Sequence, residues 1–310
     1  MSLRAQTSLT LGVMLLLTLT VLFAVIRPML SGTFARLEST EVREHVARVV
    51  NAISADWATM ESTAQDWAAW DDAYAFAAGK LPSFWDDNVT ASALENLRVN
   101  LMLLRDTDGE IIASVAVDLD SGEYVAAPAD LVDTLDTTSL PAAEASLSTA
   151  GLLRLEAGLL LMAAHAVLTS EHEGPSRGIL VLGRFLGHPE VERLAEQTHL
   201  GVTIRGLGDP AVDASILDRL LGRFAGAEDI VVHPTSGDSI AGHTLLRDLR
   251  GEPVGILSVE TTRDTYRAGQ TSLRYIGGMA VATLVFTTIL LLFLLDRRVL
   301  ARMSVLATGV

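Results

Sequence analysis

The sequence has 310 residues, no cysteine, and a net charge of −15 from 23 basic and 38 acidic residues. An acidic surface repels phosphate backbones and anionic lipid headgroups, which argues against nucleic-acid binding and against a polybasic membrane patch. The lack of cysteine excludes disulfides, thiolate nucleophiles and cysteine-ligated zinc. Lys80 is the only lysine, so lysine-dependent chemistry such as a P-loop is nearly excluded as well.

Two long apolar segments explain why so acidic a chain has a mean hydropathy of +0.36. Residues 5–26 and 275–295 carry no charged side chain. At about 1.5 Å per residue, each is long enough to cross a hydrocarbon core of roughly 30 Å. The expected organisation follows from these two spans: a cytoplasmic N-terminus at 1–7, a transmembrane helix at 8–27, an extracytoplasmic sensor domain at 28–274, a second transmembrane helix at 275–295 and a cytoplasmic segment at 296–310.

Positive charge at the two ends of the chain sets the expected orientation. Arg4 precedes the first apolar segment, and three arginines follow the second. Short segments rich in arginine stay in the cytoplasm, so we expect both termini inside and residues 27–274, with a net charge of −18, outside. A cleaved signal peptide is the alternative for the N-terminus, but Arg27 and Pro28 stand where a small-x-small cleavage site would be needed.

The region between the spans changes from a helical to an alternating pattern. Residues 33–78 contain neither glycine nor proline, and apolar residues recur there at steps of three and four. This predicts one long helix, or two helices with a tight break. Strands are expected at 99–104, 111–117, 152–155, 159–168, 178–186, 202–205, 239–246 and 253–262, with short helices at 189–200 and 214–224. The fold class is therefore a membrane protein with an α/β ectodomain, in which a long N-terminal helix joins an antiparallel sheet of PAS or CACHE type.

One phrase occurs twice in the ectodomain. The pattern LLRD-x-x-GE stands at residues 103–110 and again at 245–252, each time between two expected strands. An old duplication of a sheet module explains the repeat, and so does independent convergence of two turns on the same geometry. Both explanations remain open.

All four tryptophans lie between Trp57 and Trp85, around the segment DWAAWDDAYAF. On a continuous helix, four of its side chains would share one face: Trp67, Trp70, Asp71 and Tyr74. Such a face suits an amine or another cation, through cation–π attraction and one charged hydrogen bond. The alternative, which we favour, is that the rings pack the helix on the sheet while Asp71 caps a backbone segment or pairs with an arginine.

Arg184 is the other candidate ligand-binding residue, because it alternates with two leucines on an expected strand and can point inward. It would there hold a ligand carboxylate or form a buried ion pair with Asp71 or Asp72, and we prefer the ion pair. His165 lies on another apolar strand and is expected to be a core residue. The seven histidines show no metal-ligand spacing, so we expect no metal and no cofactor.

The aromatic segment also carries a resemblance. DWAAWDDAYAF, the following FWDDN and the later LRVNLMLLRDTDGEI resemble the type-4 CHASE domain, an extracytoplasmic sensor family. GILVLGRFL and LLRDLRGEPVGILSVETTRDTY look like the same family, so the resemblance covers roughly residues 36–271. It marks motif positions without catalytic roles, namely Trp67, Trp70, Asp71, Asp72, Tyr74, Asn88 and Asn100, and places Asp66 and Phe76 beside them as structural residues.

The resemblance implies a sensory module of a transmembrane receptor. Members of the family precede diguanylate cyclases, phosphodiesterases or histidine kinases. No G-x-S-x-G, H-E-x-x-H or Walker motif occurs, so the chain itself is not expected to be an enzyme. In the C-terminal segment, apolar residues step by four, three and four like a coiled-coil seam. We therefore expect residues 296–310 to begin a HAMP-like or signalling helix whose output domain is absent from this chain.

The expected function is extracytoplasmic sensing and transmembrane signal transduction to a cytoplasmic output domain. A cyclase or phosphodiesterase of cyclic di-GMP signalling is expected first, and a histidine kinase of a two-component system next. The expected partners are a small-molecule or physical signal, with an amine or cation as one candidate, a second copy in a homodimer, and the membrane, without nucleic acid. The expected location is the bacterial inner membrane, with a periplasmic ectodomain. The alternative is a membrane-anchored binding scaffold or adhesin without signalling output.

Overall fold

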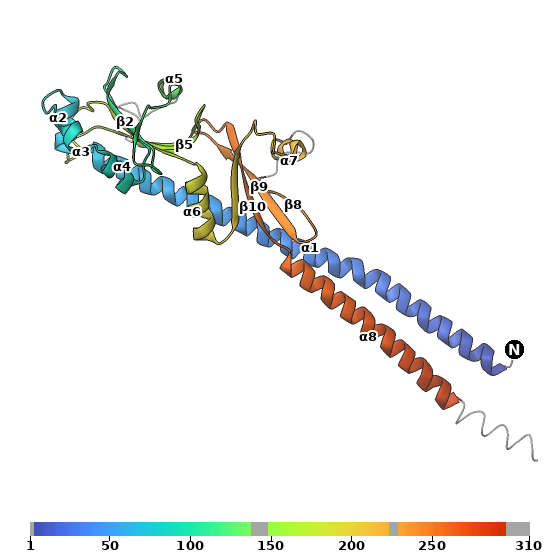
Figure 1. The fold of residues 1–310 in the computed structure, drawn as a ribbon. Coiled ribbons are helices and arrows are strands. Elements are labelled where there is room, and N and C mark those ends of the chain that lie inside the picture. Colours follow the sequence, from blue (N-terminus) through green and yellow to red (C-terminus); the bar gives the residue numbers. More distant parts are fainter. Residues whose placement is uncertain (1–2, 138–147, 223–228, 296–310) are drawn as a thin grey trace, which may run out of the picture. The chain divides into compact units, whose positions relative to one another are not determined.

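A computed structural model describes residues 3–137, 148–222 and 229–295 of the chain (Figure 1). The expected cytoplasmic helix at 296–310 lies outside the described residues. The chain divides into two compact units. The first contains Met1–Glu41, Ser236–Ser239 and Thr262–Val310, and the second contains Val42–Thr235 and Ile240–Thr261.

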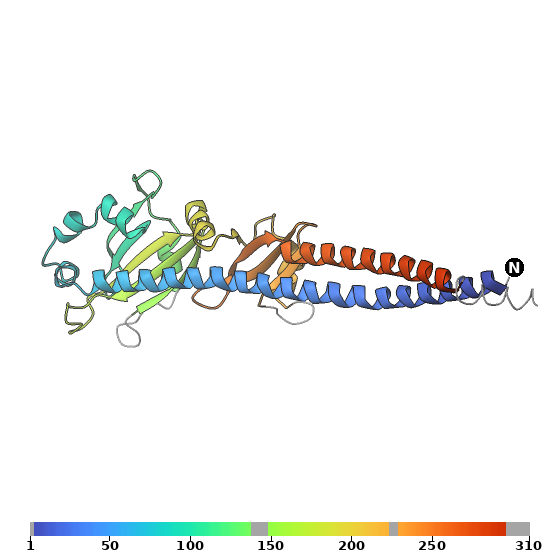
Figure 2. The ribbon, with the colours of Figure 1, turned by 90° about the horizontal axis from the view of Figure 1, so that it is seen from below.

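Two apolar helices form the first unit. They are the N-terminal part of α1 (Leu3–Ala68) and the whole of α8 (Asp264–Leu295), which lie side by side in both views (Figures 1 and 2). Each is long and apolar enough to cross a membrane. Of the most apolar 18-residue stretch, 0% is buried in α1 and 6% in α8. Because uncovered apolar helices of this length are unfavourable in water, both are candidate membrane spans.

The second unit holds two antiparallel sheets. The six-stranded sheet has the order β3-β2-β1-β6-β5-β4 and the four-stranded sheet the order β7-β10-β9-β8. The strands of the first sheet are β1 (Leu101–Arg105), β2 (Ile111–Val117), β3 (Tyr124–Val125), β4 (Ser148–Leu155), β5 (Gly158–Ala166) and β6 (Ile179–Phe185). Those of the second are β7 (Gly201–Gly206), β8 (Val231–Pro234), β9 (Ser239–Arg247) and β10 (Pro253–Thr262).

Six short helices complete this unit. They are α2 (Asp71–Ala77), α3 (Phe84–Asn88), α4 (Ala91–Leu97), α5 (Leu131–Thr137), α6 (His188–Thr198) and α7 (Ala214–Leu220). The helices α3 and α4 and the strands β3 and β8 were not predicted from the sequence. β3 has 2 residues and β8 has 4, so neither is long enough to show an alternating pattern.

The core lies on both faces of the six-stranded sheet. On one face, Met102, Leu161 and Leu182 join the buried side of α1. On the other face, their sequence neighbours Leu101, Leu160 and Val181 join α5, because successive residues of a strand point to opposite faces. Sheet residues are therefore buried on both sides, with α1 covering one face and α5 part of the other.

The helix α1 also packs closely on the four-stranded sheet within this unit. Gly242 of β9 faces α1, and a Cβ added there would lie 2.7 Å from methyl carbons of both Val42 and Val46. Only a residue without a side chain allows this approach.

The two copies of the LLRD-x-x-GE phrase form the same turn, one in each sheet. Asp106, after β1, accepts hydrogen bonds through Oδ1 from the N–H groups two and four residues later, both at 2.9 Å. Asp248, after β9, does the same at 2.9 Å. The shared geometry fits duplication and convergence equally well.

The long helix breaks before the aromatic segment ends, as in the second of the two predicted forms. α1 ends at Ala68, and Trp70 is extended, with φ −118° and ψ 128°. At the break, the carbonyl of Ala68 accepts a hydrogen bond of 3.2 Å from the N–H of Leu168. The single helical face predicted for Trp67, Trp70, Asp71 and Tyr74 is therefore wrong, because Trp67 stays on α1, Trp70 is the extended N-cap of α2, and Asp71 and Tyr74 lie on α2.

Candidate ligand-binding site

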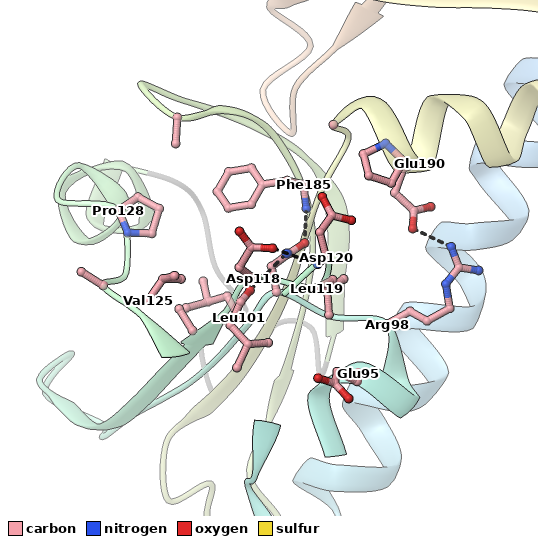
Figure 3. A pocket seen from close by; sticks show the side chains of 17 residues that line it. Glu95, Arg98, Leu101, Asp118, Leu119, Asp120, Val125, Pro128, Phe185 and Glu190 are labelled. Carbon is pink, nitrogen blue, oxygen red and sulfur yellow. Dashed lines mark hydrogen bonds and ion pairs between the residues drawn. The ribbon is translucent and has the colours of Figure 1, made fainter. Parts of the chain in front are cut away.

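A cavity of about 640 Å³ opens beside the six-stranded sheet, within the second unit (Figure 3). Its apolar wall includes Leu101, Ala116 and Phe185, which belong to the core face that α5 covers or pack against it. Leu101 and Ala116 are direct partners in the β1–β2 ladder, so two central strands form this wall. A volume of this size suits a small organic molecule.

Charged residues line the cavity at the ends of three elements. The ionisable residues in its lining are Glu95, Arg98, Asp118, Asp120 and Glu190. They come from the end of α4, the loop after β2 and the first turn of α6 (Figure 3). Four carboxylates thus face one arginine, which gives the cavity a negative field that attracts cations.

Glu190 is the buried member of this set, with an exposed fraction of 7%. Its carboxylate pairs with Arg98 at 2.5 Å and with Arg193 at 2.9 Å. Burial raises the pKa of Glu190, but the hydrogen bonds from Arg193 and Arg98 outweigh burial and hold the pKa below its usual range. Glu190 is therefore ionised in this fold at neutral pH.

Asp118 and Asp120 lie at the exposed rim of the cavity. Asp118 accepts the N–H of Asp120 at 2.8 Å, which closes the loop after β2 and aims both carboxylates at the same rim. Glu95 is exposed near the end of α4, and its carboxylate lies against Gly122 of the same loop. The rim therefore offers carboxylate oxygens to a ligand that carries positive charge.

Most residues singled out from the sequence lie outside this cavity, and Asn100 lines it. The Asn100 side chain accepts the N–H of Phe185 at 3.0 Å and donates to the carbonyl of Val117 at 3.3 Å. It thereby ties β1 to both neighbouring strands at the cavity wall. Asn88 instead donates to the carbonyl of Phe84 at 2.9 Å within α3.

The predicted aromatic residues pack on one another. Trp70 meets Trp67 and Phe84 edge to face, with ring centroids 6.1 and 5.2 Å apart. Phe76 is stacked on Trp85 at 5.8 Å. These edge and offset contacts are the arrangements that stabilise aromatic cores, which agrees with the packing alternative favoured from the sequence.

Asp71 and Tyr74 hold the loop between β5 and β6. Asp71 accepts the N–H of Ser170 at 2.9 Å, and its own N–H donates to the Ser170 hydroxyl at 3.2 Å. Tyr74 donates to the carbonyl of Pro175 at 3.2 Å and accepts a hydrogen bond of 3.2 Å from Arg177, whose guanidinium lies 5.4 Å from the ring centroid. The cation over this ring is thus one of the chain's own arginines. Asp66 and Asp72 are exposed.

Arg184 is buried, with an exposed fraction of 7%, but it does not pair with Asp71 or Asp72 as we preferred. It donates through Nε to the carbonyl of Arg98 and through Nη2 to that of Leu97, at 3.3 Å for the second bond. These carbonyls end α4 and have no partner within the helix, so Arg184 caps them. Burial lowers the pKa of Arg184, and the Coulombic attraction of Glu190 opposes that effect.

The charged rim of the cavity could not be predicted from the sequence, because the residues that form it are far apart in the chain. Asp118-x-Asp120 directly after a strand was the one local signal. Nothing local to Glu95, Arg98 or Glu190 indicates that they meet. Among the described residues, no group of three or more His, Cys, Asp and Glu side chains could hold a metal ion.

Comparisons with known proteins agree on a sensor domain. Residues 52–205 match the model of the CHASE4 domain. The methanogenesis regulatory histidine kinase FilI of Methanothrix harundinacea is 29% identical over 272 residues, which are 86% of this chain and 29% of FilI. The chain therefore spans less than a third of the length of this relative.

Two solved domains have the same fold. One is the extracellular domain vpHK1S-Z8, from a protein classed as a histidine kinase, with 11% identity and a TM-score of 0.50 over 76% of this chain and 98% of that domain. The other belongs to a sensory box/GGDEF family protein from Vibrio parahaemolyticus, with 10% identity and a TM-score of 0.50 over 77% of this chain and 99% of that domain. The described part of the chain is thus an extracytoplasmic-type sensor domain, and no catalytic domain is evident in it.

Proposed function

We propose that this chain, in which residues 52–205 form a CHASE4 domain, is the sensory half of a membrane receptor that controls a histidine kinase. The observation that carries this proposal is the cavity of about 640 Å³ within a fold of the sensor-domain type. The relation to FilI supports a kinase as the output rather than the cyclase or phosphodiesterase expected first from the sequence. Sequencing of the full-length gene is expected to show a histidine kinase domain after residue 310. A cyclase domain there would overturn the proposed kinase output.

The proposed receptor has both termini in the cytoplasm and spans the cell membrane at residues 8–27 and 275–295. The two candidate spans and the arginines beside them support this topology. Residues 28–274 are then extracytoplasmic, and the signal crosses the membrane through α1 and α8. Protease added outside intact cells should cleave within 28–274 and leave epitope tags at both ends intact.

The proposed ligand is a small molecule with a positively charged group, such as an amine. Support comes from the rim of the cavity, where Asp118, Asp120 and Glu95 offer exposed carboxylates beside the apolar wall at Phe185. Ligand binding by Trp67, Trp70, Asp71, Tyr74 and Arg184 stays a prediction from the sequence, although their observed contacts give each of them a structural role.

A parallel homodimer is the proposed assembly. In the second unit, α1 leaves a line of small side chains exposed, at Ala47, Asn51, Ser54 and Ala58. Small residues at steps of three and four let two helices approach closely. Because the chain has no cysteine, a single Ser54→Cys substitution should give a disulfide-linked dimer on oxidation, and Thr59→Cys, exposed on another side of α1, should give much less.

The ligand is tested on the full chain in lipid nanodiscs with 1,4-diaminobutane as the probe. A ligand at 100 times its Kd stabilises by about 2.7 kcal/mol, which corresponds to a Tm increase of about 5–10 °C for a domain of this size. The increase should disappear in the double variant Asp118→Asn, Asp120→Asn and persist in the exposed control Asp66→Asn. If Asp71→Asn abolishes the increase and the rim variant keeps it, the ligand binds at the aromatic segment instead. If neutral or acidic solutes stabilise and the diamine does not, the charge assignment is wrong.

A further inference from the structure

Four charged residues form a continuous chain of ion pairs that begins at the cavity and ends on α1. The order is Arg98, Glu190, Arg193 and Asp56, which we call the ion chain. Arg98 and Glu190 line the cavity, whereas Arg193 lies one turn further along α6 and Asp56 lies on α1. All four belong to the second unit.

Glu190 is the branch point, because its two oxygens serve different cations. Oε1 accepts from Nη2 of Arg98 at 2.5 Å, and Oε2 accepts from Nε of Arg193 at 2.9 Å. Figure 3 shows the Arg98 guanidinium turned toward Glu190 at the edge of the cavity. A change at one oxygen alters the charge available at the other, because both belong to one delocalised carboxylate.

Arg193 uses all three of its nitrogens. In addition to Glu190, it binds Asp56 through Nη2 and Gln197 through Nη1, at 2.9 Å for the second bond. The Arg193 and Asp56 side chains are 23% and 24% exposed, so solvent screens this pair less than a surface pair. Burial lowers the pKa of Arg193, but the hydrogen bonds and charges of Glu190 and Asp56 raise it by more. Within the ion chain, Arg193 is thus the residue that joins α6 to α1.

Arg98 is the end of the ion chain that a ligand can reach. Its side chain is 45% exposed, whereas its partner Glu190 is 10% exposed. Its backbone is held in place, since it caps α4 in the left-handed conformation at φ 55° and its carbonyl accepts from Arg184. The guanidinium can therefore move while the backbone stays fixed.

We propose that the ion chain reports occupancy of the cavity to α1, with Arg193 as the positioning residue that joins the two. This rests on the proposed function, because it assumes that the cavity binds the signal. A cationic group that approaches Glu190 displaces Arg98 from Oε1 and thereby changes how strongly Glu190 holds Arg193. The balance of Arg193 between Glu190 and Asp56 then changes, and with it the way α6 is held on α1. Interaction energies that depend on shared partners of this kind are not additive.

The test needs no ligand, because removing the Arg98 charge breaks the same ion pair at Oε1 of Glu190. Spin labels are placed at two exposed positions, Thr59→Cys on α1 and Glu196→Cys on α6, in the full chain in nanodiscs. The distance between the labels is measured in the parent, in Arg98→Gln and in the control Arg177→Gln, whose partner is Tyr74. We expect Arg98→Gln to shift the mean distance between the labels by about 1–2 Å, the size of helix shifts in other proteins. The control Arg177→Gln should leave the distance unchanged.

The role of Arg193 is tested by repeating the measurement with Arg193→Gln or Arg193→Met, so that one poorly folding variant does not block the result. With the link removed, Arg98→Gln should cause no further change. An unchanged distance in Arg98→Gln, or the same change with and without Arg193, would overturn the proposal. If the diamine stabilises the chain but the distances do not respond, the ion chain proposal falls and the proposed ligand stands. If the distances respond and the diamine does not bind, the proposed ligand falls and the ion chain stands.

Discussion

Arg263 holds the carboxylate of Glu38 with two nitrogens, Nη2 at 2.8 Å from Oε2 and Nε at 3.1 Å from Oε1. Both residues belong to the first unit, Glu38 on α1 and Arg263 directly before α8. Glu38 is 3% exposed, and the Arg263 guanidinium also lies 4.3 Å from the ring centroid of Tyr266. The hydrogen bonds that Arg263 donates to Glu38 raise the pKa of Arg263. This pair fixes the start of α8 against α1.

Glu38→Ala should therefore destabilise the first unit. It leaves the half-buried Arg263 guanidinium without its counter-ion, and losing hydrogen bonds to a charged group costs about 1.5–3 kcal/mol. Thermal unfolding in nanodiscs, followed by circular dichroism, measures the loss. The control is Glu41→Ala, one turn away and exposed, with one hydrogen bond of 3.2 Å from Thr265. The control should change stability by less than about 1 kcal/mol, and equal losses in both variants would contradict the prediction.

His243 makes the stability of the second unit depend on pH. Its ring lies 5.0 Å from that of His233, and its Nδ1 lies 2.7 Å from the Ser258 hydroxyl. Burial and the charge of His233 together lower the pKa of His243 from 6.5 to about 4, against the opposing charges of Asp213 and Glu260. The folded chain therefore favours the neutral imidazole.

The sign of the pH effect follows from this lowered pKa. Above pH 6.5 both the folded and the unfolded chain hold a neutral His243, so stability is complete. Between pH 6.5 and about 4 only the unfolded chain takes up the proton, so the free energy of unfolding falls by on the order of 2–3 kcal/mol as the pH falls. His243→Gln should flatten this part of the unfolding profile. The control His188→Gln, at a side chain that is 83% exposed, should leave it unchanged.

Gly242→Ala tests the close approach of β9 to α1. The added Cβ would lie 2.7 Å from the methyl carbons of Val42 and Val46. Overpacking of this kind costs about 1–3 kcal/mol. Gly206→Ala is a matched control, since it also lies in a strand and a Cβ there has nothing within 4 Å. Chemical denaturation of the two variants should separate them, and equal midpoints would show that α1 can move away from the sheet.

Arg184→Leu should destabilise the end of α4 beside the cavity, although Arg184 itself does not line the cavity. The carbonyls of Leu97 and Arg98 lose their buried donor, which costs about 1–3 kcal/mol. Hydrogen exchange at the amides of α4 should then become faster, while exchange in α7 stays as in the parent. Protection that remains unchanged in α4 would mean that water replaces the guanidinium at both carbonyls.

Local patterns were sufficient to predict the elements whose residues repeat over many positions. The apolar segments, the long helix and both main hairpins follow from periodicity within a single stretch of chain. The phrases at 103–110 and 245–252 also predicted two similar turns, because an Asp-x-x-Gly turn is formed by bonds within five residues. The sequence could not say that these turns belong to separate sheets.

The site depended on contacts between distant residues. Arg98, Asp118 and Glu190 meet at one cavity because β1 lies between β2 and β6, a pairing that no local pattern encodes. In the aromatic segment, the local spacing predicts one continuous helix, but α1 ends at Ala68, whose carbonyl accepts a hydrogen bond from the N–H of Leu168.

By itself, then, the amino-acid sequence determined a cysteine-free chain with two candidate membrane spans, an acidic α/β region between them, and a motif that resembles the CHASE4 domain. These properties depend on composition and on short-range periodicity. Only the tertiary structure decided that Asp71 and Arg184 bind neighbouring backbone, that the cavity lies at the ends of β1, β2 and β6, and that an ion chain leads from it to Asp56. A charged side chain is satisfied by whichever partner the fold brings within hydrogen-bond distance, and that partner here lies about a hundred residues away in the chain.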